Sequence, residues 1–367
     1  MNTSLRDLAL AAARGEHRLT AAEALELLDS ADLLDLGAAA SAMRERLHPD
    51  ARVTFIVDRN VNYTNVCVSG CSFCAFYRDP GHTESYVLDA GSLSAKVAET
   101  IDLGGTAILL QGGMHPDLTI EWYEEMLRCV KDAHPAIHVH GFGPPEIVHI
   151  AAVSGLPTAE VLRRLSNAGL DSLPGGGAEI LVDRVRAHLS PNKATAAEWL
   201  GVMREAHELG ISTTATMMFG SHETLGERVE HLEAIRNLQD EAAHRGHVGF
   251  RAFIPWSFQP GNTAYGEATG ALPASGWEYL RVLAVSRLYL DSVDNIQASW
   301  VTQGAKIGQV ALAFGANDMG STMIEENVVA AAGTRFMLAR EELVRLIADA
   351  GFTPVQRDTL YRTIRSF

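Results

Sequence analysis

The stretch Cys67-Val68-Ser69-Gly70-Cys71-Ser72-Phe73-Cys74 holds three of the four cysteines in this 367-residue chain. Its CxxxCxxC spacing places the three thiols in one short segment. Thiolates are soft ligands that favour iron–sulfur clusters, zinc and cuprous copper. A [4Fe–4S] cluster normally takes four cysteines, so a set of three would leave one iron free to bind a small molecule. The spacing alone leaves three interpretations open: such a cluster, a zinc site, or thiols without a metal.

The neighbouring residues bear on these alternatives. A tetrahedral zinc site needs a fourth ligand, which His82 could supply from eight residues further on. A disulfide is typical of short secreted chains, and this chain is long and poor in cysteine. Cys129 lies apart from the other cysteines, in an amphipathic segment, where a lone cysteine is usually a small buried hydrophobic residue. We therefore predict that Cys129 is not a ligand.

Composition limits the classes of partner. The net charge of −15 argues against non-specific binding to nucleic acid or to an anionic membrane surface. No apolar run reaches the roughly 18 residues that a membrane helix needs, and the amino-terminal residues do not resemble a signal peptide. With so few cysteines, the sequence predicts a cytoplasmic protein with neither a nucleic-acid nor a membrane partner.

Hydrophobic periodicity indicates an α/β fold. Residues 1–50 read as helices, and from Val53 short apolar runs alternate with longer amphipathic segments, as in repeated βα units around a parallel sheet. The predicted strands are 53–57, 107–110, 137–139, 170–173, 212–217 and 249–254. The predicted helices between them are 92–103, 120–133, 159–168, 194–209 and 223–243. We expect a (β/α)6 partial TIM barrel at 51–265, after a helical segment at 1–50. A helical extension at 266–367 is expected to close the barrel.

Polar, glycine-bearing loops follow the predicted strands and do not precede them. Examples are Gln111-Gly112-Gly113 after the second strand and Pro174-Gly175-Gly176-Gly177-Ala178-Glu179 after the fourth. In a parallel barrel the carboxyl ends of all strands open on one face, where ligands bind. These loops and the cysteine segment are therefore predicted to form one active-site mouth.

The cysteine segment continues as Ala75-Phe76-Tyr77, and CxxxCxFC after a first barrel strand resembles the signature of the radical S-adenosylmethionine superfamily. The resemblance implies that Cys67, Cys71 and Cys74 hold a [4Fe–4S] cluster whose open iron binds S-adenosylmethionine. Reductive cleavage would then give a 5′-deoxyadenosyl radical, with the hard chemistry belonging to the cofactor. It also implies an electron donor such as flavodoxin or ferredoxin, for which Arg59 and Arg78 are the nearest basic candidates.

The same resemblance suggests which residues bind S-adenosylmethionine. The candidates are Gln111, Gly112 and Gly113 for the methionine amino group, Glu179 and Lys193 for ribose and carboxylate, and Gly220, Glu223 and Tyr77 beside adenine. Three of these assignments have an ordinary structural alternative: Glu179 as a first-turn helix acid, Lys193 as a surface lysine, and Gly220 with Glu223 as a helix cap. The turn at Gln111 lacks the acidic residue of the usual Gly-Gly-Glu motif, so backbone carbonyls would bind the amino group.

Further motifs narrow the resemblance to the dehypoxanthine futalosine cyclase family of the futalosine route to menaquinone. They span roughly residues 53 to 335 and lie at 62–67, 174–179, 213–220, 253–263 and 315–329. Aminofutalosine synthases and deazaflavin-forming synthases are related families and remain alternatives. Met218-Phe219 and Gln259-Pro260-Gly261-Asn262 favour the cyclase family.

This family resemblance implies that the substrate, dehypoxanthine futalosine, loses its ribose C4′ hydrogen and cyclises onto its benzoate ring. His140 and Tyr63 are candidates for the base, with His115 and His222 also possible. Arg78 and Arg251 are candidates to bind the substrate carboxylate, and the alternative for each is a structural ion pair. Asn262 is a further substrate-binding candidate. An alternative of another class is a zinc-stabilised barrel that binds a ligand without radical chemistry.

Overall fold

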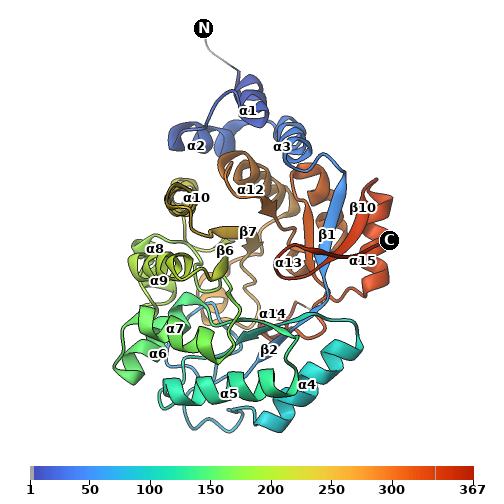
Figure 1. Cartoon of the computed structure of the whole chain (residues 1–367). Helices are drawn as coiled ribbons and strands as arrows, with labels where there is room; N and C mark the ends of the chain where they lie inside the picture. Colours follow the sequence, from blue (N-terminus) through green and yellow to red (C-terminus); the bar gives the residue numbers. More distant parts are fainter. Residues whose placement is uncertain (1–3, 335) are drawn as a thin grey trace.

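The computed structural model describes residues 4–334 and 336–367. It begins with three helices, α1 (Leu5–Arg14), α2 (Ala21–Ser30) and α3 (Leu33–Leu47). A capping box starts α2, because the Thr20 side chain accepts from the Glu23 amide while the Glu23 carboxylate accepts from the Thr20 amide. Helix α3 packs on α1 and on α12 (Gly276–Tyr289) at one end of the molecule (Figure 1).

Two consecutive strands, β1 (Arg52–Ile56) and β2 (Asp58–Asn62), then enter two different sheets. The predicted first strand at 53–57 coincides with β1, which pairs with β9 and β10 and does not lead into the cysteine segment. The strand that does so is β2, and the expectation is wrong on this point. Asp58, Asn60 and Asn62 make β2 too polar to resemble the apolar strand of a buried parallel sheet.

The main sheet is parallel and seven-stranded, in the order β2-β3-β4-β5-β6-β7-β8. Its remaining strands are β3 (Ala107–Gln111), β4 (His138–Gly141), β5 (Ser172–Leu173), β6 (Ser212–Phe219), β7 (Phe250–Ser257) and β8 (Asn295–Ile296). The connecting helices are α4 (Ala90–Asp102), α5 (Ile120–Ala133), α6 (Pro144–Ser154), α7 (Thr158–Ala168), α8 (Asp183–Leu189), α9 (Ala196–Glu208) and α10 (Leu225–Arg245). The predicted α/β partial barrel is thus confirmed.

Residues after 263 carry both helices and strands. The helices are α11 (Ala264–Thr269), α12, α13 (Trp300–Ala311), the 3-10 turn η1 (Leu312–Phe314), α14 (Val328–Ala331) and α15 (Arg340–Asp349). The strands, apart from β8, are β9 (Asp318–Ser321), β10 (Thr353–Arg357) and β11 (Thr363–Ser366), which form a second sheet in the order β11-β10-β1-β9.

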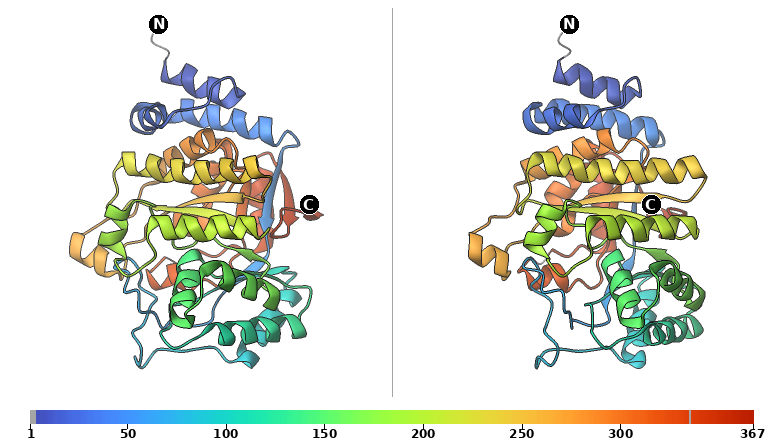
Figure 2. Two further views of the ribbon diagram at one scale, coloured as in Figure 1. Left: turned by 60° about the vertical axis from the view of Figure 1, so that its left-hand side comes forward. Right: turned by 90° about the vertical axis from the view of Figure 1, so that its left-hand side faces the viewer.

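Strand β9 joins the two sheets. The Ala298 amide, just after β8, donates to the Asp318 carbonyl, and the Thr322 amide, just after β9, donates to the Ile56 carbonyl. Because β1 runs on into β2, these bonds complete a ring of backbone hydrogen bonds around the barrel. Helices α9 and α10 cover one side of it (Figure 2). No helix in the described part of the chain is long and apolar enough to cross a membrane.

Candidate active site

The cysteine loop follows β2 at the carboxyl end of the sheet, and backbone hydrogen bonds fix it to three other loops. The Val68 amide donates to the Met114 carbonyl and the Ser72 amide to the Leu189 carbonyl, at 3.0 and 2.8 Å. The Tyr265 amide of α11 donates to the Ser72 carbonyl at 2.8 Å. Loops after β2, β3, β5 and β7 therefore meet at the three thiols, as predicted for an active-site mouth.

Arg78 has a structural role in this loop. Its Nη1 donates to the carbonyls of Ala75, Phe76 and Tyr77, and its Nε forms an ion pair with Glu84 at 2.7 Å. A guanidinium that binds three consecutive carbonyls fixes the loop conformation. Arg78 does not line the cavity described below, so this geometry does not support it as a substrate ligand.

The three thiols lie close enough to influence one another. Burial raises the pKa of Cys71 to about 11 and also raises the pKa of Cys74, and in each case a neighbouring cysteine adds to the increase. The Ser69 hydroxyl lies 3.0 Å from the Cys71 sulfur. Buried, mutually repelling thiols are stable as thiolates only when a cation binds them. This donor set fits a metal cluster.

The geometry of the set does not favour a single zinc ion. Within residues 4–334 and 336–367, no group of three or more His, Cys, Asp or Glu side chains converges on one ion position. Three thiolates that serve three different irons of a cube need not converge on one point. His82, the possible fourth zinc ligand, is exposed, and its Nδ1 accepts from the Glu84 amide in a local turn.

The glycines after β3 are in close contact with this loop. A Cβ atom on Gly113 would lie 2.1 Å from the Val66 carbonyl oxygen and 2.9 Å from the Cys67 Cβ. A Cβ on Gly112 would lie 2.5 Å from the Tyr63 ring. Only glycine allows such an approach of two backbones. Gly113 thus lies beside Cys67, and Gln111 and Gly112 precede it in the same turn.

Glu146 anchors this turn and was not identified from the sequence. Its carboxylate accepts from the Tyr63 hydroxyl at 2.7 Å, the Gly112 amide at 3.0 Å and the Gly143 amide at 2.8 Å. Burial raises the pKa of Glu146 to about 7. A carboxylate from the first turn of α6 therefore fixes the Gly112 turn, which has no acidic residue of its own. The only signal in the sequence is an acid after Pro144-Pro145, at a helix start.

Tyr63 is unsuited to the role of base. Its ring is fully buried, packed edge-on against Tyr123 and Phe142, and its hydroxyl is bonded to Glu146. Burial raises its pKa well above the usual value. Tyr63 does not line the cavity, so its contacts indicate a structural role behind the Gly112 turn.

Glu179 and Lys193 form a buried pair at the same mouth, with Nζ 2.9 Å from Oε1. Burial acts to lower the pKa of Lys193, but the charge and hydrogen bond of Glu179, together with Cys71, raise it overall. Glu179 has a φ of 40°, a strained conformation for a non-glycine residue. Its Oε2 is buried without a hydrogen-bond partner among the described residues. Arg186 Nη1 lies 3.6 Å from this oxygen, too far for a hydrogen bond, so the oxygen remains free to accept from a ligand hydroxyl group.

Arg186 supports this pair and was also missed from the sequence. It donates to the carbonyls of Ala178 and Ala194 and lies 3.6 Å from Glu179. Lys193 Nζ lies 5.4 Å from the centre of the Phe73 ring in the cysteine loop. The segment after α8 that carries Lys193 therefore lies against the cysteine loop.

Gly220 and Glu223 form a tight turn after β6. Gly220 has a φ of 90°, and its amide donates to the Glu223 carboxylate at 2.6 Å. Arg228 donates to the same carboxylate at 2.9 Å. Glu223 therefore fastens the turn, while Thr224 caps α10.

Tyr77 is half-buried, and its pKa is raised by burial and by nearby groups that include all three cysteines, so it lies beside them.

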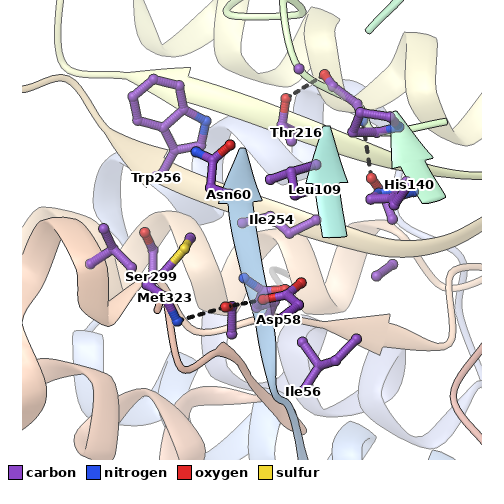
Figure 3. A pocket seen from close by; sticks show the side chains of 18 of the residues that line it. Ile56, Asp58, Asn60, Leu109, His140, Thr216, Ile254, Trp256, Ser299 and Met323 are labelled. Carbon is purple, nitrogen blue, oxygen red and sulfur yellow. Dashed lines mark hydrogen bonds between the residues drawn. The ribbon is translucent and has the colours of Figure 1, made fainter. Parts of the chain in front are cut away.

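A cavity of about 300 Å³ occupies the barrel interior. Ile56, Asp58 and Asn60 point into it from alternate positions along the β1–β2 segment, and Trp256 lines it from β7 (Figure 3). Gln111, Gly175 and Gly176 line it next to the mouth. The cavity therefore extends from the glycine loops beside the thiols into the barrel, as expected for a substrate site below a cofactor site.

His140 is the predicted base candidate that lines this cavity. Its Nδ1 lies 2.7 Å from the Ser172 hydroxyl, and burial lowers its pKa to about 3, so the ring is neutral. His115 and His222 lie outside the cavity.

The other predicted substrate ligands do not line the cavity either. Arg251 Nε binds the Ser212 hydroxyl, and the exposed Asn262 donates to the Ala331 carbonyl. Arg59, suggested for electron-donor docking, is buried and paired with Glu99 at 2.6 Å, so that suggestion is wrong.

Comparison with known proteins agrees with this site. The radical SAM superfamily matches residues 61–235, and the CofH/MqnC C-terminal region matches residues 247–366. The chain is 47% identical over 356 residues to cyclic dehypoxanthine futalosine synthase from Halalkalibacterium halodurans, covering 97% of this chain and 94% of that protein. This chain belongs to the radical SAM superfamily, in its CofH/MqnC branch. Its cofactors are accordingly a [4Fe–4S] cluster and S-adenosylmethionine.

Two further relatives carry different names. Cyclic dehypoxanthine futalosine synthase from Streptomyces coelicolor is 45% identical, covering 94% of this chain and 85% of that protein. The 5-amino-6-(D-ribitylamino)uracil–L-tyrosine 4-hydroxyphenyl transferase of Methanopyrus kandleri is 42% identical, covering 91% of this chain and 94% of that protein. The radical SAM enzyme therefore has relatives with two different activities at similar distances.

Solved structures confirm the fold. The hydrogenase maturase HydG from Carboxydothermus hydrogenoformans superposes with a TM-score of 0.76 at 16% identity, covering 98% of this chain and 80% of HydG. Methylornithine synthase (PylB) gives a TM-score of 0.70 at 19% identity, covering 96% and 97%.

Proposed function

We propose that this radical SAM enzyme converts dehypoxanthine futalosine to cyclic dehypoxanthine futalosine in menaquinone biosynthesis. The observation that carries the proposal is the 47% identity to a synthase of that name over nearly the whole chain. When bound and reduced, the cluster and S-adenosylmethionine supply a 5′-deoxyadenosyl radical. The substrate would lose its ribose C4′ hydrogen, and the carbon radical would add to the benzoate ring. One proton and one electron, the latter taken by a one-electron carrier, would then leave to restore aromaticity.

The residues around the mouth would hold the cofactors. Cys67, Cys71 and Cys74 would ligate three irons, and the Gly112–Gly113 backbone, fixed by Glu146, would orient the methionine amino group. Glu179 Oε2 would accept from a ribose hydroxyl, and Lys193 beside it would attract the methionine carboxylate.

The cavity would hold the substrate. Its walls are mainly apolar, with Leu109, Ile254, Trp256 and Trp300 among the lining residues. Such walls suit an aromatic ring and exclude water from a carbon radical. Polar lining residues lie between these apolar side chains. A molecule with a benzoate at one end and a sugar at the other therefore fits this cavity.

The test is anaerobic turnover of the reconstituted enzyme, with flavodoxin or ferredoxin as electron donor. The product is identified by mass spectrometry. We expect dehypoxanthine futalosine to be consumed with stoichiometric 5′-deoxyadenosine formation. A parallel assay with 5-amino-6-(D-ribitylamino)uracil and L-tyrosine addresses the transferase relative. Product from that pair, with dehypoxanthine futalosine untouched, would refute the proposal.

His140 is proposed to accept the proton released on rearomatisation. It is neutral, lines the cavity, and its Nε2 has no hydrogen bond to the described residues. His140→Gln keeps a polar side chain next to Ser172 but removes a basic nitrogen. We expect product formation to fall by about 100-fold, the lower end of the range for a lost general base. Liquid chromatography would follow product and 5′-deoxyadenosine separately.

His138→Gln is the matched control for His140→Gln. The His138 Nε2 lies 2.7 Å from the same Ser172 hydroxyl, but His138 does not line the cavity. The control should retain most of the activity. Equal losses in the two variants would assign both histidines to structural support of Ser172.

A further inference from the structure

The floor of the cavity is built by the chain's last residues, far from the cysteines in sequence. Arg357, Thr359 and Tyr361 line the cavity from the end of β10 and the loop before β11. Asp58 lies at the amino end of β2, whereas the cysteines follow its carboxyl end. Burial raises the pKa of Asp58 to about 6, and Arg357 is near enough to oppose that increase. The floor is therefore the end of the cavity opposite the cofactor site.

Two hydroxyl groups at this floor have no hydrogen-bond partner. The Thr359 Oγ1 and Tyr361 Oη atoms are buried without one among the described residues. Leaving a buried hydroxyl unpaired costs roughly 1 to 3 kcal/mol, so such groups usually serve a ligand or water. Both residues line the cavity, which places the two hydroxyl groups next to the space that a ligand would occupy.

The backbone holds Tyr361 in a strained conformation. Its φ is 62°, which is unfavourable for a bulky residue. Asp358 stabilises the turn, since its Oδ1 accepts from the Leu360 and Arg362 amides at 2.9 Å each. The Arg357 guanidinium lies 3.9 Å from the centre of the Tyr361 ring. Strain kept in place by specific contacts is typical of ligand sites.

The charges near the floor favour an anion. Arg357 is paired with Asp318, at 3.0 Å between Nη2 and Oδ1. Arg287 is also fully buried, and it has no carboxylate within salt-bridge distance in residues 4–334 and 336–367. Arg287 and Arg357 both act to lower the pKa of Tyr361, although burial raises it overall. Two buried arginines, Arg287 and Arg357, thus act on Tyr361 against the single carboxylate of Asp318.

We propose that Thr359 and Tyr361, with Arg357 behind them, bind the carboxylate of the substrate. This rests on the proposed function and deepens it, because it fixes the orientation of the substrate. The benzoate would lie at the floor among apolar walls, and the sugar would lie at the mouth, beside the radical source. Hydroxyl groups donate well to a carboxylate, and the nearby guanidinium strengthens the interaction electrostatically.

The experiment compares dehypoxanthine futalosine with its carboxamide analogue on the reconstituted holoenzyme. Binding is measured by calorimetry without reductant, and turnover is then measured with reductant. The variant carries both Thr359→Val and Tyr361→Phe. The control is Thr106→Val, which removes another buried, unpartnered hydroxyl outside the cavity. Cluster content and thermal unfolding verify that each variant is folded.

We expect the double variant to bind the carboxylate substrate at least tenfold more weakly, with less than a twofold change for the carboxamide. Thr106→Val should change neither affinity. Equal weakening for both ligands, or none, would overturn the proposed floor site while leaving the proposed function intact. If the wild-type enzyme neither binds nor converts dehypoxanthine futalosine, the proposed function fails, and the floor proposal falls with it.

Discussion

Replacing any one of Cys67, Cys71 or Cys74 by alanine is expected to abolish 5′-deoxyadenosine formation. Each thiolate would ligate a different iron, so loss of one leaves an iron that the remaining two cannot hold. The loop itself should persist, because its anchors are backbone bonds to Met114 and Leu189. After anaerobic reconstitution, iron content, visible absorption and cleavage of S-adenosylmethionine should all fall together.

Cys129→Ala provides the control for these variants. Cys129 lies in α5, half-buried, and lines only a separate surface groove. The variant should bind as much iron as the wild-type enzyme and should retain its activity. Full activity in any of the three loop variants, or iron loss in Cys129→Ala, would contradict the assignment of the ligands.

Gly113→Ala is expected to have the second largest effect. The new Cβ would lie 2.1 Å from the Val66 carbonyl oxygen, well inside van der Waals contact, and neither backbone can yield without moving the cysteine loop. Overpacking of this kind costs about 1 to 3 kcal/mol or more. A shift of about 1 Å near reacting groups can reduce rate by roughly 100-fold. Product formation should therefore fall by about two orders of magnitude, with a lower melting temperature.

Gly201→Ala is the matched control. Gly201 lies inside α9, and a Cβ there would meet no atom within 4 Å. Alanine should stabilise this helix by up to about 1 kcal/mol. Thermal unfolding and turnover of the two variants side by side would separate the local clash from a general effect of alanine. A Gly113→Ala enzyme with normal turnover would show that the close approach is not required.

The parts of the site that the sequence predicted are those encoded by short local patterns. The cysteine spacing and the glycine turns after β3 and β5 each require a particular residue at a particular place, so they can be recognised without the fold. Lys193 and Glu179 were likewise found by their position relative to a predicted strand. The alternation of apolar runs and amphipathic helices was sufficient for the α/β barrel.

The parts that were missed depend on contacts between distant segments. Glu146 and Arg186 are single charged residues whose partners are backbone atoms of other loops. Arg357 and Tyr361 reach the cavity only because β10 pairs with β1 across the sequence. Tyr63 was predicted as a possible base because its burial against Tyr123 is a tertiary contact, which the sequence alone does not show. The sequence also placed the strand that leads to the cysteines at 53–57 and missed β2. Strand β2 is polar because its inward side chains face a cavity and not an apolar core.

The pairing of β1 with β9 and β10 also has a consequence for biosynthesis. The cysteines are translated early, yet the loop that holds them is complete only after Tyr265 has been made, and the barrel ring only after Asp318. Contacts between such distant segments form slowly, and an incomplete barrel exposes its strand edges. The three thiols should therefore stay accessible on the nascent chain until synthesis is nearly finished. That interval gives the machinery that delivers iron and sulfide time to act before the site is enclosed.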